Sequence, residues 1–163
     1  MARMDMIIRE EDHSRLMGVL DTLNTESNAR FIFLIDKSGQ QIARTGDVSG
    51  IDHTSLASLT AGSVAATEGL AALLDERAFT TLYHEGQNDN LFISLISDSS
   101  VLLVVFDEHS SIGLVRLRVD QFKPELSGVM DDICNRTDPK TPVTVNTGEF
   151  EEISDDDIEA LFG

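Results

Sequence analysis

The sequence contains little of what would point to several common classes of protein. Lysine and arginine number 12 against 29 aspartates and glutamates, which gives a formal net charge of −17. A chain this acidic is a poor match for nucleic acid or for an anionic membrane surface, so we expect neither as a partner. Cys134 is the single cysteine, which excludes a disulfide within the chain and fits a reducing cytoplasm.

Long apolar runs are also missing. The most apolar stretch, 52–74, is interrupted by Asp52, His53 and Glu68, and no unbroken run of twenty apolar residues exists. The N-terminus has no apolar segment of the kind found in secretory signals. We therefore expect a cytoplasmic protein with no membrane span.

Motifs for catalysis and metal binding are absent as well. The sequence contains no phosphate-binding loop, no dinucleotide fingerprint and no zinc-protease motif. Its four histidines stand singly, without the spacing of metal ligands: His13, His53, His84 and His109. We predict a protein that is not an enzyme and has no cofactor, no catalytic residue and no metal site.

The stretch 52–74 is the most informative part of the sequence, and it predicts one long helix with two distinct rows. One row repeats at spacings of three and four and is typical of a core stripe: Leu56, Leu59, Ser63, Ala66, Leu70 and Leu73. The row beside it contains only small residues: Ser58, Gly62, Ala65, Gly69 and Ala72. A glycine inside a helix costs about 1 kcal/mol relative to alanine, so something must approach this row closely. The approaching surface is either the helix's own sheet or another protein chain, and spacing favours neither.

Apolar periodicity predicts two further helices and five strands around this helix. The helices are expected at 11–28 and at 112–133, the second one kinked or restarted at Pro124. Short turns join the last three of the five expected strands, which are 30–36, 41–45, 80–85, 91–96 and 101–106. The order helix, two strands, helix, three strands, helix predicts an α/β sandwich built on one antiparallel sheet. We expect this domain to span 1–136.

The composition changes after the predicted domain. We interpret 137–152 as a flexible linker, because 137–148 contain two prolines, four threonines and little that could pack. The segment 153–163 comes next. It overlaps an acidic run, 149–159, that holds seven acids and no base. Ser154 can cap a short helix there, Ile153 and Ile158 can form a hydrophobic staple, and Leu161 and Phe162 share a face with Ile158. This pattern predicts a docking helix, and the alternative is a tail that only keeps the protein soluble.

Five segments, in order along the chain, closely resemble the Roadblock family of longin-like domains, and in particular its bacterial members that regulate cell polarity and gliding motility. They are FLIDKSGQ, IDHTSLASLTAGSVAATEGLAALL, HEG, VLLVVFDEHSSIGLVRLRV and EEISDDDIEALF. The resemblance covers nearly the whole chain. It implies a profilin-like sandwich, in which a five-stranded antiparallel sheet carries one long helix on one face and two helices on the other.

The resemblance also implies partners and sites. It implies a homodimer whose two chains engage one MglA, a small Ras-like GTPase, and act as its activating protein. It also implies a location at a cell pole, with polar adaptor proteins as further partners. GTPase contacts are then implied at the small-residue row. A second contact, with an effect on nucleotide exchange, is implied for the tail at Ile153, Ile158, Leu161 and Phe162. Pairing of the third strands in the dimer is implied at Thr80, Thr81, Leu82, Tyr83 and His84.

The implied mechanism has a chemical consequence that the sequence can address. Many GTPase activators supply an arginine finger, which is worth about 10³–10⁵ in rate. The relatives are understood instead to realign the GTPase's own residues, and 52–74 agrees because it contains no arginine or lysine. Arg77 lies just beyond this stretch and stays a candidate. Two alternatives are a Roadblock-type scaffold that links polarity proteins without affecting GTP turnover, and a small-molecule sensor with a polar pocket.

Overall fold

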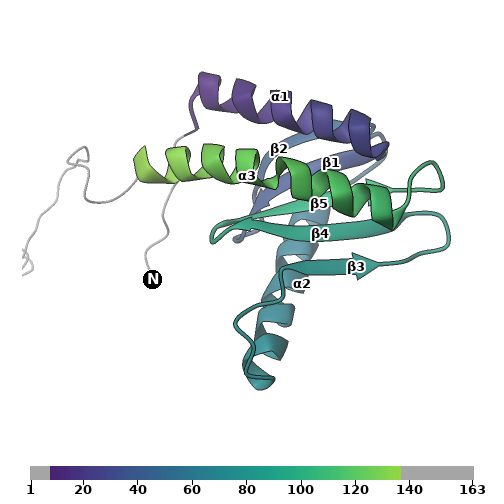
Figure 1. Cartoon of the computed structure of the whole chain (residues 1–163), viewed down its shortest axis with the longest axis vertical. Coiled ribbons are helices and arrows are strands. Elements are labelled where there is room, and N and C mark those ends of the chain that lie inside the picture. The colour runs from purple at the N-terminus through teal and green to yellow at the C-terminus, as the bar shows by residue number, and fades with distance from the viewer. Residues whose placement is uncertain (1–7, 137–163) are drawn as a thin grey trace, which may run out of the picture. The chain divides into compact units, whose positions relative to one another are not determined.

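The structure is a computed structural model that describes residues 8–136, and its elements follow the predicted order (Figure 1). They are α1 (Glu10–Ser27), β1 (Phe31–Asp36), β2 (Gln41–Gly46), α2 (His53–Leu73), β3 (Thr81–His84), β4 (Asn90–Ser97), β5 (Ser100–Phe106) and α3 (Ile112–Arg136). The chain divides into two compact units, 8–131 and 1–7 with 132–163, and the sheet belongs to the first. The predicted linker and docking helix, 137–163, lie outside the described residues.

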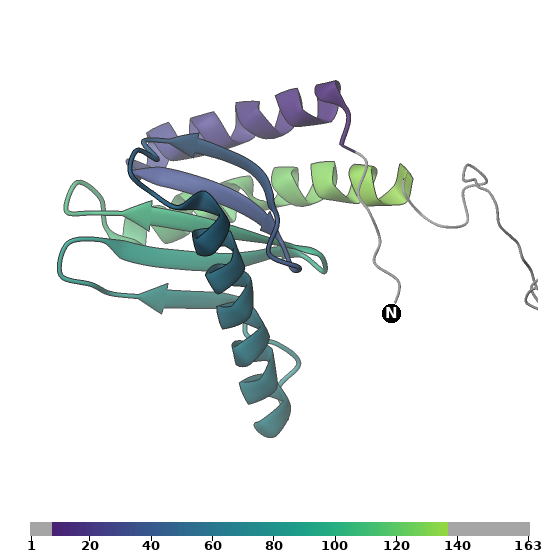
Figure 2. The same cartoon turned by 180° about the vertical axis from the view of Figure 1, so that it is seen from behind.

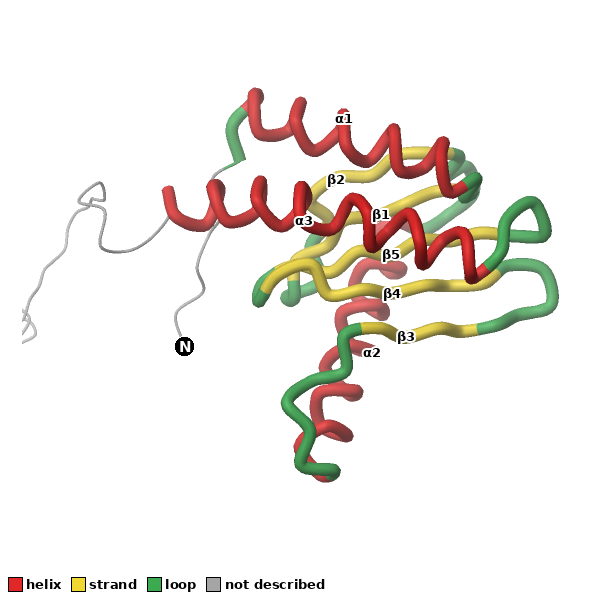
Figure 3. Tube along the Cα trace, in the orientation of Figure 1, coloured by secondary structure: helices red, strands yellow, loops and turns green. Residues whose placement is uncertain are grey.

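The five strands form one antiparallel sheet in the order β2-β1-β5-β4-β3. The central strands β1 and β5 carry continuous apolar runs, Phe31 to Ile35 and Val101 to Phe106, and all these side chains are buried. Such runs are expected of strands that are covered on both faces. Figure 3 shows α1 and α3 on one face of the sheet, and Figure 2 shows α2 on the other. The predicted sandwich is therefore confirmed.

α3 covers the sheet as one helix that passes through Pro124, so the expected restart at this proline does not occur. Pro124 has no backbone N–H to donate, but it lies on the exposed side of the helix. The buried side holds Val115, Val119 and Leu126, in agreement with the predicted three–four repeat. Tertiary packing along this stripe outweighs the lost hydrogen bond.

α2 begins at a side-chain cap. Asp52 accepts hydrogen bonds from the Ser55 backbone nitrogen at 3.2 Å and from the Ser55 hydroxyl at 2.8 Å. The helix then crosses the sheet obliquely, and its C-terminal half extends past β3 (Figures 1 and 2). Lys37 of the β1–β2 turn forms an ion pair with Glu68 in the C-terminal half of α2, with 2.6 Å between Nζ and Oε2, whereas buried residues of the first half, such as Ala57 and Val64, pack on the core of the sheet. The first half of α2 is thus fixed on the sheet and the second half projects beyond it.

By length and composition, α2 is the one helix within residues 8–136 that would be long and apolar enough to cross a membrane. Core helices of globular proteins pass the same test. Asp52, His53 and Glu68 nevertheless interrupt the apolar run of this stretch. In this fold Ala57, Thr60, Ala61 and Val64 of α2 are buried, as expected of a helix packed on a sheet.

Candidate functional site

The leucines that the sequence assigned to the core lie on the outward face of α2. The side chains of Leu59, Leu70 and Leu73 are 71%, 56% and 83% exposed. Of the expected core row, Leu56 alone packs against the core cluster, and it is partly buried. The residues that are buried on α2 are instead small or β-branched: Ala57, Thr60, Ala61, Val64 and Ala71. The predicted core stripe was therefore wrong, because half of α2 projects past the sheet and small side chains face the other half.

The predicted small-residue row is exposed along its whole length: Ser58, Gly62, Ala65, Gly69 and Ala72. A Cβ placed on Gly62 or on Gly69 would meet no atom within 4 Å outside the helix's own backbone. Ser58 differs, since a Cβ on Gly39 of the β1–β2 turn would lie 3.3 Å from the Ser58 Cα. Packing within the chain therefore explains a small residue at Ser58, but nothing in the described part of the chain explains the two glycines.

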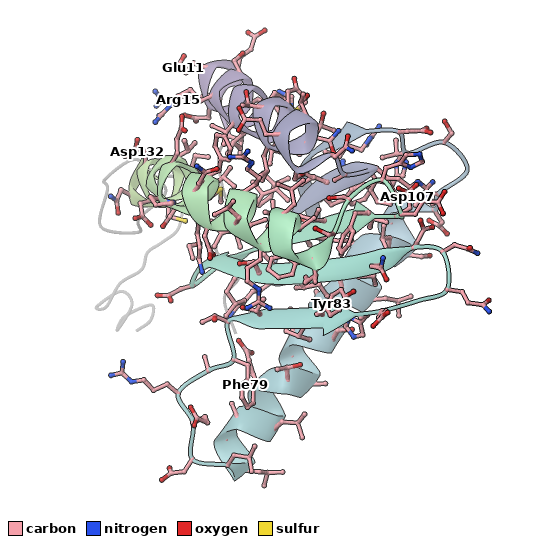
Figure 4. The ribbon with its side chains drawn as sticks, turned by 45° about the vertical axis from the view of Figure 1, so that its right-hand side comes forward. Glu11, Arg15, Phe79, Tyr83, Asp107 and Asp132 are labelled. Atoms are coloured by element: carbon pink, nitrogen blue, oxygen red, sulfur yellow. The ribbon has the colours of Figure 1, made fainter. Side chains whose placement is uncertain are left out.

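The two rows together form one surface, which we call the outward face of α2: Ser58, Leu59, Gly62, Ala65, Ala66, Gly69, Leu70, Ala72 and Leu73. Because successive residues of an α-helix turn by about 100°, the leucine row lies roughly opposite the buried row and the small row lies beside it. Leu74 and Phe79 extend the exposed apolar surface at the projecting end. Figure 4 shows Phe79 on the connector that runs from this end of α2 to β3. A contiguous exposed apolar surface of this kind marks a protein interaction site.

Charge is nearly absent from the outward face. α2 contains no lysine or arginine. Its one acidic residue, Glu68, is paired with Lys37. Arg77 is exposed on the connector between α2 and β3. The face can therefore bind an apolar or small-residue surface, but it offers no cation to stabilise a negatively charged transition state.

β3 lies at an edge of the sheet, which is the position that the predicted dimer contact requires. Thr80, Tyr83 and His84 are exposed, and Thr81 and Leu82 are half-buried. The Tyr83 ring, labelled in Figure 4, stacks on the Phe106 ring with 6.2 Å between centroids. One side of β3 is thus held by the sheet, and the other side is free in the described structure.

The hydrogen bonds of β3 show which of its amides face the free edge. The Leu95 N–H donates to the Thr80 carbonyl at 3.0 Å, so these two residues form a hydrogen-bonded pair. Such pairs alternate along an antiparallel ladder, and the register pairs Leu82 with Ile93. The amide of Leu82 therefore faces β4, whereas the amides of Thr81 and Tyr83 face outward. These outward groups can pair with a strand of another chain.

A charged cluster that the sequence did not predict connects several loops at one end of the sheet. Arg30 and Asp89 form an ion pair of 2.6 Å, and the hydrogen bond from Arg30 to Asp89 raises the pKa of Arg30, with further contributions from Asp47 and Asp107. The backbone and ring of His109 both bond to Asp107, which lowers the pKa of Asp107 and raises that of His109. These residues are far apart in the sequence, so no local pattern could have revealed the cluster. The cluster holds these loops together, and none of its residues belongs to α2.

The predicted tail contacts Ile153, Ile158, Leu161 and Phe162 lie outside the described residues. Within residues 8–136, no group of three or more histidine, cysteine, aspartate or glutamate side chains could hold a metal ion.

Comparisons with known proteins identify the family. A family model described as the Roadblock/LC7 domain matches residues 18–106. The solved structure of MglB from Myxococcus xanthus is 42% identical, with a TM-score of 0.73, and the match covers 78% of this chain and 96% of that chain. A comparison with curated protein sequences found no match.

Two further solved structures agree with this assignment. The gliding protein MglB of Thermus thermophilus is 28% identical with a TM-score of 0.74, and the match covers 80% of this chain and 99% of that chain. A structure described as MglB with tetrameric arrangement is 27% identical with a TM-score of 0.76, and the match covers 81% and 99%. The exposed helix face, the five-stranded sheet and these matches lead to one conclusion: the chain belongs to the Roadblock/LC7 family.

Proposed function

We propose that this chain is a homodimeric regulator of a small Ras-like GTPase of the MglA type, and that it accelerates GTP hydrolysis without a catalytic side chain of its own. The similarity to the MglB structures supports this setting of cell polarity and gliding motility. The observation that carries the proposal is the outward face of α2, which is exposed, apolar, lined with small residues and free of arginine and lysine.

The outward face suits a partner that comes close to a helix backbone. Gly62 and Gly69 leave open space beside α2, so a backbone segment of the GTPase can approach there. Leu59 beside the small-residue row is exposed and supplies apolar area, and burial of one leucine side chain is worth about 1.5–3 kcal/mol. Such a face provides binding energy and position. The rate increase would come from the GTPase's own arginine and glutamine, because catalytic groups act only when they are aligned with the reacting phosphate.

Dimerisation through β3 fits the projecting half of α2. Because α2 extends past β3, a second chain paired at this edge would lie beside the projecting half. Leu70, Leu73 and Leu74 could then be covered by the partner, while the small-residue row stays open toward the GTPase. This arrangement would bring two copies of the row together, in agreement with two regulator chains on one GTPase.

The C-terminal segment is a separate part of the proposal. Its acidic and apolar pattern, 153–163, favours a second contact with the GTPase and an effect on nucleotide exchange. The proposal also places the protein in the cytoplasm at a cell pole. Both statements rest on the sequence.

The test is GTP turnover by a purified MglA-type GTPase, alone and with this protein. We expect an increase on the order of 10²-fold, the size associated with correct placement of catalytic groups. Arg77→Ala should retain the stimulation, since the proposal needs no arginine finger. Loss of the whole stimulation in this variant would instead make Arg77 the finger. Binding without any change in turnover would contradict the proposal and favour a scaffold.

A further inference from the structure

A cleft separate from the outward face of α2 lies between the start of α2 and the β1–β2 hairpin. Its volume is about 340 Å³. Gln41 and Arg44 of β2 contribute to its lining, as do His53 and Thr54 of the first turn of α2. Gln40 of the β1–β2 turn also lines the cleft, so five polar residues border one small space.

The charge of the cleft is opposite to that of the chain. Arg44 and His53 are the ionisable side chains among the described lining residues, and no carboxylate lines the cleft. This is notable because residues 1–136 hold 21 acids and 11 bases. Asp52 and Asp36 are the adjacent acids, but both carboxylates already accept hydrogen bonds: Asp52 from the backbone and hydroxyl of Ser55, and Asp36 from Ser38 and from the Gln40 backbone. The cleft therefore favours a ligand with negative charge.

Gln41 and His53 restrict the shape and chemistry of that ligand. The Oε1 atom of Gln41 is buried and has no hydrogen-bond donor in the structure. The His53 ring is held in place, because its Nε2 lies 3.4 Å from the Val48 carbonyl oxygen and its edge packs on Phe33 at 5.6 Å between centroids. A fitting ligand accepts hydrogen bonds from Arg44, and it donates one to Gln41 once the buried Oε1 of that side chain turns toward the cleft. An acidic peptide does both, through its side-chain carboxylates and its backbone N–H groups.

We propose that the cleft binds the acidic C-terminal segment of this same chain, 149–159. This segment holds seven acids and no base, so its charge complements that of the cleft. The twelve residues 137–148 that precede it span up to about 40 Å when extended. A domain of this size has a radius of gyration of about 14 Å, so the fully extended linker is longer than twice that radius. A short tether also gives the segment a local concentration on the order of millimolar.

Docking in the cleft would hold the segment on its own domain until a partner displaces it. The contact would thereby regulate when the apolar residues of the tail are available to another protein. The inference does not rest on the proposed function, because both binding groups belong to this chain and no GTPase takes part. The two proposals can therefore fail separately.

The first experiment compares backbone amide NMR signals of the full chain with those of a full-length variant whose tail acids are replaced by the corresponding amides. The replaced residues are Glu149, Glu151, Glu152, Asp155, Asp156, Asp157 and Glu159. We expect differences at Gln41, Arg44, His53 and Thr54. Arg44→Gln should abolish these differences, whereas the matched control Arg77→Gln, an exposed arginine on the connector, should preserve them. Identical cleft signals with and without the tail acids would overturn the proposal.

The second experiment titrates a synthetic peptide of residues 148–163 into the full-length variant with the neutralised tail. Arg44→Gln should weaken binding about tenfold to a hundredfold, the size of a lost charge-assisted hydrogen bond. Equal weakening by Arg77→Gln would reveal general charge attraction and contradict a specific cleft. A parallel titration uses acetate in place of the peptide. If acetate shifted the NMR signals of the cleft residues at the same concentrations as the peptide, the ligand would be any free carboxylate and not the tail.

Discussion

Gly39 lies so close to Ser58 that a Cβ on Gly39 would be 3.3 Å from the Ser58 α-carbon. Gly39 also has a φ of +99°, a conformation that favours glycine. Gly62 and Gly69 of α2 have ordinary helical neighbours and open space around them. Glycine thus has two roles near α2: it lets the β1–β2 turn pack on the helix at Ser58, and it keeps the outward face of α2 bare.

These two roles predict opposite effects of alanine substitution on stability. Gly69→Ala should raise the free energy of unfolding by about 0.5–1 kcal/mol, because alanine is the better residue inside an exposed helix. Gly39→Ala should lower it by about 1 kcal/mol or more, because the side chain is strained at positive φ and crowds Ser58. Denaturant unfolding of both variants measures the difference. A destabilised Gly69→Ala chain would mean that Gly69 packs within its own fold.

The free edge of β3 gives a prediction about assembly. Thr81→Pro removes an amide that faces outward, so it should weaken the dimer and leave the fold largely intact. Leu82→Pro removes an amide that faces β4, so it should destabilise the chain itself. Light scattering reports the oligomeric state and thermal unfolding reports stability. A wild-type chain that is monomeric at micromolar concentration would reject pairing through this strand.

The cap of α2 makes the helix start sensitive to acid. The Ser55 hydroxyl, followed by the Ser55 backbone N–H, lowers the pKa of Asp52. A carboxyl group with a lowered pKa in the folded state stabilises the fold above its unfolded pKa, and this stabilisation is lost as the pH falls through the folded pKa. Ser55→Ala should therefore raise the pKa of Asp52 and move acid unfolding to higher pH. Carboxyl-carbon NMR titration measures this pKa, and an unchanged value would contradict the role of the hydroxyl.

The tail should be separable from the domain. A chain ending at Thr147 is expected to keep its fold, its dimer and its stimulation of GTP hydrolysis, but to bind the GTPase less tightly and to lose any effect on nucleotide exchange. The double substitution Leu161→Ala with Phe162→Ala should have the same effects while keeping every charge. Fluorescence titration of the GTPase measures affinity. If only neutralisation of the acids weakened binding, the tail would act as an electrostatic attractor and not as a docking helix.

Local patterns predicted most of the fold. The order of elements follows from apolar periodicity and from short turns, and the structure confirms it. The small-residue row was also found from spacing, because glycines inside a helix require an explanation. Spacing could not show whether the row packs on its own sheet or on another chain. The structure shows that Gly39 packs against Ser58, while Gly62 and Gly69 have open space beside them.

Other features depend on tertiary placement and were missed. The leucines of α2 repeat like a core stripe, but the C-terminal half of the helix extends past β3, and its Leu70 and Leu73 are exposed. The Leu82 amide points toward β4 because of the register between the two strands. This register cannot be read from the sequence of β3 alone. The cleft beside Arg44 arises where β2 meets the first turn of α2, and no motif joins those residues.

We propose that the GTPase binds the outward face of α2, and stimulated GTP hydrolysis is the direct test of this contact. The measurement compares turnover by an MglA-type GTPase in the presence of wild type, Gly69→Arg, Ala65→Arg and Gly128→Arg. Gly128 is the matched control, because it is a glycine with open space around it on α3, on the opposite face of the sheet. We expect Gly69→Arg and Ala65→Arg to lose stimulation while remaining folded, and Gly128→Arg to retain it. Wild-type stimulation by Gly69→Arg or Ala65→Arg would contradict the proposal that the GTPase binds this face.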